Sequence, residues 1–76
     1  MSSLGTVPFG RFERFLLHIG CVFDRQKGDH RIYKRADLKR PLVVPVKNPL
    51  PAFIVRNNLR TLGITTGQFL DILKRI

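Results

Sequence analysis

One histidine of this 76-residue chain lies where an imidazole can act on a phosphate. His30 follows a glycine turn and has Arg25, Lys27 and Arg31 close to it in the sequence. An imidazole can accept or release a proton near pH 7, and neighbouring cations can hold a phosphate and the negative charge that develops on it. RNA carries its own nucleophile, the 2′-hydroxyl. One base beside a bound phosphate can therefore be enough for strand cleavage without a metal.

The other residues with reactive side chains favour structural interpretations. His18 falls on the polar side of a predicted helix, which is typical of a solvated histidine. Cys21 is the single cysteine and is interpreted as a small apolar strand residue. One cysteine and two histidines are too few for a structural zinc site, so we expect no metal and no cofactor. Tyr33 is interpreted as a half-buried strand residue whose hydroxyl reaches water, with stacking on a base as the alternative.

Charge is the strongest global property of the chain. Fourteen Lys and Arg against five Asp and Glu give a net charge of +9, which attracts polyanions. Nucleic acid is the first candidate partner, an acidic protein the second and a membrane surface the third. No apolar run approaches the ~18 residues of a membrane span, and no signal peptide is recognisable, so we expect a cytoplasmic protein. Half of the cations cluster between residues 25 and 40, namely Arg25, Lys27, Arg31, Lys34, Arg35, Lys39 and Arg40.

Hydrophobic periodicity predicts one α+β domain over residues 9–76, preceded by a loose tail over residues 1–8. Apolar side chains at helical spacing predict a first helix from Phe9 that ends near Gly20. A three-stranded antiparallel meander follows, with helices on one sheet face and the other face open. Thr65 and Gln68 are spaced as a capping box, which predicts that the last helix begins at Thr66. The predicted order is helix 9–19, strands 21–26, 30–34 and 42–44, a helix after Pro51 that ends at Gly63, and a helix from 66.

Residues 25–34 read Arg-Gln-Lys-Gly-Asp-His-Arg-Ile-Tyr-Lys and resemble the HicA toxin family, whose corresponding motif is RQKGSHH followed by an aromatic and a basic residue. The flanking sequence is similar to the family in the same order, and the resemblance covers about residues 9–76. Its other matching segments are Gly20, Leu42-Val43-Val44-Pro45, Leu50-Pro51, Leu59-Arg60, Leu62-Gly63-Ile64 and the stretch from Gln68 to Leu73.

The resemblance implies a fold like that of double-stranded-RNA-binding domains, and it implies cleavage of mRNA. In the family, cleavage is attributed to the first histidine of GSHH, which is His30 here, and a HicB antitoxin encoded beside the toxin blocks it. Two positions depart from the motif, because Asp29 replaces the serine and Arg31 replaces the second histidine. Arg31 adds a cation. Asp29 can either orient His30 or repel RNA, and the neutral serine of the family favours repulsion.

The sequence therefore predicts the toxin of a type II pair, a metal-independent endoribonuclease acting on mRNA and inhibited by an acidic HicB-like protein. His30 is the proton-transfer residue, and Gly28 shapes the turn before it. The predicted RNA-binding residues are Arg25, Lys27, Gly28, Arg31 and Lys34. Two alternatives stay open at this point: a non-catalytic RNA-binding module that uses the same basic face, and a small basic structural protein of a ribonucleoprotein.

Overall fold

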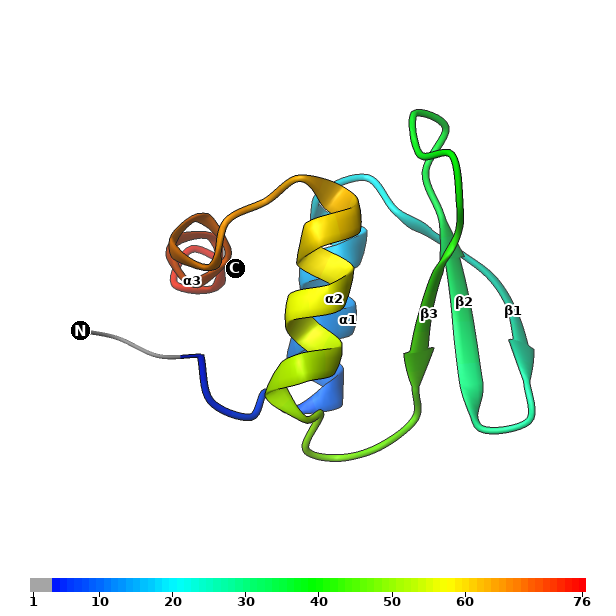
Figure 1. Cartoon of the computed structure of the whole chain (residues 1–76), viewed down its shortest axis with the longest axis horizontal. Helices are drawn as coiled ribbons and strands as arrows, with labels where there is room; N and C mark the ends of the chain where they lie inside the picture. The colour runs from blue at the N-terminus through cyan, green and yellow to red at the C-terminus, as the bar shows by residue number, and fades with distance from the viewer. Residues whose placement is uncertain (1–3) are drawn as a thin grey trace.

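The computed structural model describes residues 4–76 and has the predicted element order α-β-β-β-α-α (Figure 1). The helices are α1 (Phe9–His18), α2 (Ala52–Leu62) and α3 (Thr66–Leu73). The strands β1 (Val22–Lys27), β2 (His30–Lys34) and β3 (Leu42–Pro45) form one antiparallel sheet in the order β1-β2-β3. The α+β class and the meander are therefore confirmed.

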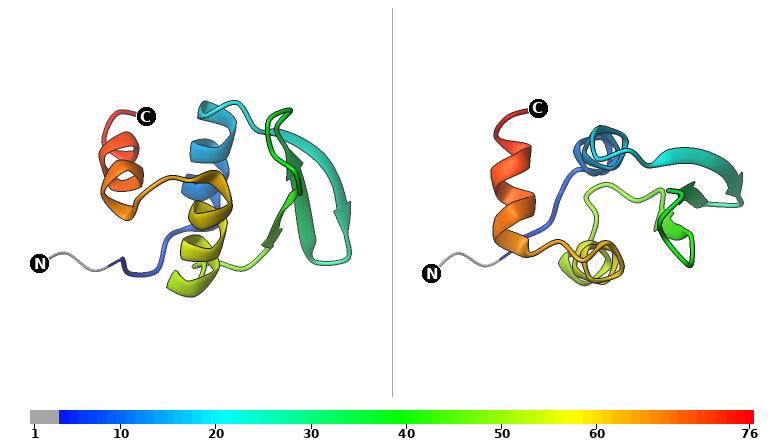
Figure 2. Two further views of the ribbon diagram at one scale, coloured as in Figure 1. Left: turned by 45° about the horizontal axis from the view of Figure 1, so that its top comes forward. Right: turned by 90° about the horizontal axis from the view of Figure 1, so that it is seen from above.

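The elements form layers. Helices α1 and α2 lie side by side between the sheet and α3, so that one sheet face is covered and the other is open (Figure 2). Three fully buried aromatic rings join the helices: Phe12 and Phe15 come from α1, and Phe69 comes from α3. The centroids of Phe15 and Phe69 are 4.7 Å apart in an edge-to-face arrangement, which is a favoured geometry for aromatic pairs.

Local signals in the sequence define the ends of the last two helices. Gly63 ends α2 with φ of 72°, a left-handed conformation that glycine adopts without steric cost. The backbone N–H of Gln68 donates to Oγ1 of Thr65 at 3.0 Å, and the backbone N–H of Thr65 donates to Oε1 of Gln68 at 2.9 Å. This capping box satisfies two N–H groups that the helix itself leaves free, and α3 begins at Thr66 as predicted.

The segment before α1 differs from the expected loose tail. Leu4 and Val7 are buried, and Val7 forms a β-bridge with Leu50 through two backbone hydrogen bonds of 3.2 and 2.7 Å. In so small a domain the core is thin, and two apolar side chains from a short segment can complete it. The rest of the predicted tail, residues 1–3, lies outside the described residues. Across the described part of the chain, no helix combines the length and the apolar character needed to cross a membrane.

Candidate active site

The hairpin between β1 and β2 determines where His30 lies. His30 is the first residue of β2 and pairs across the hairpin with Lys27, the last residue of β1. The two-residue loop between them has Gly28 at its first position with φ of 61°, as a type II′ hairpin loop requires. The side-chain amide of Gln26 donates to the carbonyl oxygen of Gly28 at 3.1 Å. The predicted glycine turn is present and holds His30 opposite a lysine.

Successive residues of β2 face opposite sides of the sheet. Tyr33 is fully buried and its hydroxyl donates to the Glu13 carboxylate on α1, so Tyr33 and Arg31 face the helices. His30 and Lys34 alternate with them and therefore lie on the open face. Burial rules out base stacking by Tyr33, and its hydroxyl reaches Glu13 instead of water. Burial, followed by the hydrogen bond with Glu13, raises the pKa of Tyr33.

A β-bulge brings two more cations of the motif to the open face. The pairing of β1 with β2 shifts between Phe23 and Arg25, so that Asp24 is the extra residue. Phe23 consequently pairs with Tyr33 on the covered face, whereas Arg25 and Lys27 pair with residues of the open face. The structure thus places four of the predicted residues on the same sheet face. We call them the outer cluster: Arg25, Lys27, His30 and Lys34.

Acidic residues partly balance the outer cluster. Asp24 forms an ion pair with Arg25 and lies 3.5 Å from Nζ of Lys34. Within residues 4–76, Lys27 forms no ion pair. Both lysines are exposed, and the side chain of Arg25 is 59% exposed, so all three cations reach solvent. A polyanion approaching the open sheet face meets them first.

His30 is in contact with its neighbour in the turn. Its Nδ1 lies 2.9 Å from Oδ1 of Asp29, and the His30 side chain is 50% exposed. At this distance the two side chains form an ion pair when the imidazole is protonated. The other ring nitrogen, Nε2, has no hydrogen-bond partner within the part of the chain that the structure describes. Nε2 is therefore the ring nitrogen that is left for an incoming substrate.

Arg31 is not brought together with the outer cluster. Its NH1 lies 3.3 Å from Oε2 of Glu13, and its guanidinium lies 4.3 Å from the centre of the Phe23 ring. The Arg31 side chain is only 28% exposed, and its Nε is buried without a hydrogen-bond partner. This packing holds the guanidinium between α1 and the covered sheet face, on the side away from His30.

Comparison with known proteins decides the family. The family model for the HicA toxin of bacterial toxin-antitoxin systems matches residues 10–64, which is well over half of the chain. The chain belongs to the HicA toxin family. No curated protein and no solved structure matches the chain. The matched segment runs from α1 through α2 and contains the outer cluster, so this HicA toxin is the toxin of a toxin–antitoxin system.

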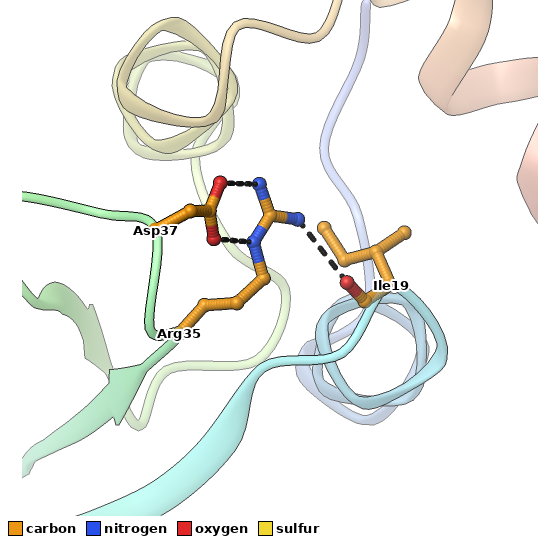
Figure 3. A network of polar contacts seen from close by, with 3 residues as sticks. All are labelled: Ile19, Arg35 and Asp37. Atoms are coloured by element: carbon orange, nitrogen blue, oxygen red, sulfur yellow. Dashed lines mark hydrogen bonds and ion pairs between the residues drawn. The ribbon is translucent and has the colours of Figure 1, made fainter.

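Two further groups near the motif of this HicA toxin have structural roles. Arg35 donates two hydrogen bonds to the Asp37 carboxylate, at 2.6 and 2.9 Å, and one to the carbonyl oxygen of Ile19 at 3.1 Å (Figure 3). These bonds fasten the loop after β2 to the end of α1, raise the pKa of Arg35 and lower the pKa of Asp37. Burial raises the pKa of the Cys21 thiol, so that it stays protonated and unreactive at neutral pH.

A groove beside His30 in this HicA toxin contains two residues that the sequence did not single out. It has a volume of about 280 Å³ and separates the β1–β2 turn from the first turn of α2. Lys47 adds a cation to it, and Phe53 adds an aromatic ring that is 57% exposed. Phe53 falls outside the apolar stripe of its helix, and this position was the available signal that its ring is not part of the core.

Proposed function

We propose that this HicA toxin is a metal-independent endoribonuclease that cleaves single-stranded mRNA in the cytoplasm through His30. The observation that carries the proposal is the position of His30 on the open sheet face. There an exposed imidazole, oriented through Nδ1, has Lys27 directly opposite it. A phosphate held by the cations of the outer cluster would lie next to a general base.

In the proposed reaction, Nε2 of His30 accepts the proton of a 2′-hydroxyl. The 2′-oxygen then forms a bond to the adjacent phosphorus, and the bond between phosphorus and the 5′-oxygen breaks. The leaving 5′-oxygen takes a proton from water, and the products carry a 2′,3′-cyclic phosphate and a 5′-hydroxyl. Lys27 and Arg25 stabilise the negative charge that develops on the phosphoryl oxygens. The imidazolium returns its proton to solvent, which is possible because His30 is half exposed.

Asp29 is proposed to orient His30 rather than to repel RNA. The 2.9 Å contact between Asp29 Oδ1 and His30 Nδ1 supports this role, because it leaves Nε2 as the proton acceptor. The Asp29 side chain is 82% exposed, so solvent screens its charge and weakens its repulsion of a nearby phosphate. The contact therefore favours the role that the sequence had ranked second.

The proposed RNA-binding set is narrower than the one the motif suggests. Arg25, Lys27 and Lys34 reach solvent on the face of His30, and Gly28 shapes the turn between the two strands. Arg31 is left out of the set, because Glu13 and Phe23 occupy its guanidinium. Arg31 is instead proposed to stabilise the packing of α1 on the covered sheet face through Glu13 and Phe23.

Membership of the family also supports a protein partner. We propose an acidic HicB-like antitoxin that binds over the outer cluster and covers His30. A partner of opposite charge would associate rapidly with a toxin of net charge +9. The complex should bind RNA weakly and should not cleave it, whereas the isolated toxin should do both.

The proposal is tested with two matched oligonucleotides of one sequence, one of RNA and one of DNA. The purified toxin should bind both and cleave only the RNA, leaving a 2′,3′-cyclic phosphate that mass spectrometry detects. DNA lacks the attacking 2′-hydroxyl, so its backbone should stay intact. Addition of the neighbouring antitoxin should stop cleavage. RNA that is bound but never cut would instead identify a non-catalytic RNA-binding module.

A further inference from the structure

The groove beside His30 has a chemical character that the proposed phosphate chemistry does not explain. Its lining includes Asp29 and His30 from the hairpin, Val46 and Lys47 from the loop after β3, and Phe53 and Ile54 from α2. The loop after β3 and the β1–β2 turn lie at the same end of the molecule as the start of α2 (Figure 1). The backbone N–H of Val46 donates to the carbonyl oxygen of Asp29 at 2.7 Å, which joins that loop to the turn.

The groove is preformed. Pro45 and Pro51 also line it, and proline fixes the backbone dihedral φ at both positions. Its volume of about 280 Å³ lies just below the range of small-molecule sites, ~300–1,000 Å³. A flat ring with a short attachment fits such a space, whereas a larger ligand does not. The size of the groove therefore favours a single nucleotide unit.

Phe53 gives this groove an aromatic surface. Its ring is 57% exposed, whereas the chain buries Phe12, Phe15 and Phe69 completely. Single-stranded nucleic acids bind by stacking unpaired bases on aromatic side chains while cations hold the backbone. Lys47 is exposed in the same groove and supplies such a cation, and His30 marks the place of the reacting phosphate.

We propose that this groove binds a nucleobase of the RNA next to the cleaved phosphate, with Phe53 as the stacking surface and Lys47 as a phosphate contact. The inference rests on the proposed function, because it takes His30 as the site of the phosphate. Phe53 is then a specificity-determining residue, since only an unpaired base can enter the groove. Stacking accepts every base, so Phe53 selects single-stranded RNA without selecting its sequence.

The test uses uncleavable probes. One is a single-stranded DNA of about ten deoxyuridines, within the site sizes of single-strand binding domains, and the other is an abasic DNA of the same length. The wild type should bind the base-bearing probe more tightly. Phe53→Ala should lose about 5- to 100-fold of affinity for it, the range of one lost stacking contact, and should bind the abasic probe like the wild type.

Three controls make the result specific to a stacked ring. Phe53→Tyr should retain the preference for bases, and Phe53→Leu, which keeps apolar area without a ring, should lose most of it. Leu17→Ala removes a similarly exposed apolar side chain from α1 and should bind both probes like the wild type. All variants should melt within a few degrees of the wild type, because Phe53 and Leu17 are both exposed.

Several results would overturn the proposal. An unchanged preference for the base-bearing probe in Phe53→Ala would show that Phe53 is not the stacking surface. An unchanged preference in Phe53→Leu would show that apolar contact, and not ring stacking, produces it. Loss of antitoxin binding in Phe53→Ala, with base preference intact, would make the groove a protein contact. Because the probes cannot be cleaved, these outcomes are independent of whether the toxin cuts RNA. A toxin without nuclease activity can still show the preference, and an active nuclease can lack it.

Discussion

The two faces of the sheet use the same short motif in opposite ways. On the open face, His30 is half exposed, and the cations beside it reach solvent. On the covered face, Arg31 and Tyr33 both reach Glu13 of α1, and Arg31 also stacks on Phe23. Adjacent residues of β2 therefore differ in function: His30 is accessible to a ligand, whereas Arg31 is held by Glu13. Three cations of the motif, Arg25, Lys27 and Lys34, are thus available for binding, whereas the fourth, Arg31, supports the fold.

The largest effect is expected from the covered face. Tyr33→Ala removes a fully buried ring and leaves a cavity beside Glu13, so the free energy of unfolding should fall by about 3–5 kcal/mol. Chemical denaturation followed by circular dichroism measures this loss. Lys27→Ala on the open face is the matched control and should change the free energy of unfolding by less than about 0.5 kcal/mol. Equal losses in the two variants would contradict the division between the faces.

The open face should determine how RNA affinity responds to salt. Replacing Lys27 and Lys34 together by Ala removes two phosphate contacts, and each contact changes the slope of log affinity against log salt by about 0.7 on a single strand. Between ~50 and ~200 mM salt, the double variant should therefore lose about sevenfold less affinity than the wild type. Binding titrations at several salt concentrations provide the slope.

Arg31→Ala is the control for that slope. It removes a positive charge from the same strand, but from the covered face, where Glu13 holds it. The salt dependence should stay that of the wild type, while the melting temperature should fall. A slope flattened by Arg31→Ala would return this residue to the RNA-binding set.

A smaller effect is expected at Asp29. An exposed ion pair contributes about 0–1 kcal/mol, so Asp29→Ser should slow cleavage by up to about fivefold by releasing the His30 ring. RNA affinity should stay constant. Single-turnover cleavage rates and dissociation constants separate the two quantities. Faster cleavage with tighter binding would instead show that the carboxylate acts by repulsion.

The smallest effect concerns stability at alkaline pH. The pKa of Tyr33 is raised in the folded state, so its stabilising contribution is complete below the ordinary tyrosine value of about 10 and is lost as pH rises above that value. Between about pH 9 and about pH 11, the wild type should therefore lose more stability than Tyr33→Phe, which has no group to ionise at this position. Thermal melts of both proteins across this pH range measure the difference.

Much of the fold follows from local sequence signals. The Thr65–Gln68 capping box defines the start of α3, and Gly28 defines the hairpin that carries His30, because both signals depend on nearby backbone groups. The buried positions of Leu4 and Val7 were not predicted, since contact with Leu50 depends on residues more than 40 positions away. The sequence pattern around Leu4 and Val7 therefore does not indicate that Leu50 is their partner.

The candidate site shows the same limit. His30 and the cations of the outer cluster were identified by residue type and spacing. Their faces were not, because the bulge at Asp24 resets the alternation of β1. Arg31 was wrongly grouped with the phosphate binders. Its ion pair with Glu13 links β2 to α1, and the local motif does not indicate this contact. Phe53 and Lys47 reach the groove only after the chain has turned back toward His30.

The role of His30 is tested by comparing the two histidines of the toxin. Single-turnover cleavage of a single-stranded RNA is measured for the wild type, His30→Ala and His18→Ala at matched RNA occupancy. General acid–base catalysis contributes about 10²–10⁴-fold, so His30→Ala should cleave at least ~10²-fold more slowly while it binds RNA and melts like the wild type. His18, exposed at the end of α1, should be replaceable without loss. Cleavage by His30→Ala at the wild-type rate would show that His30 is not the general base.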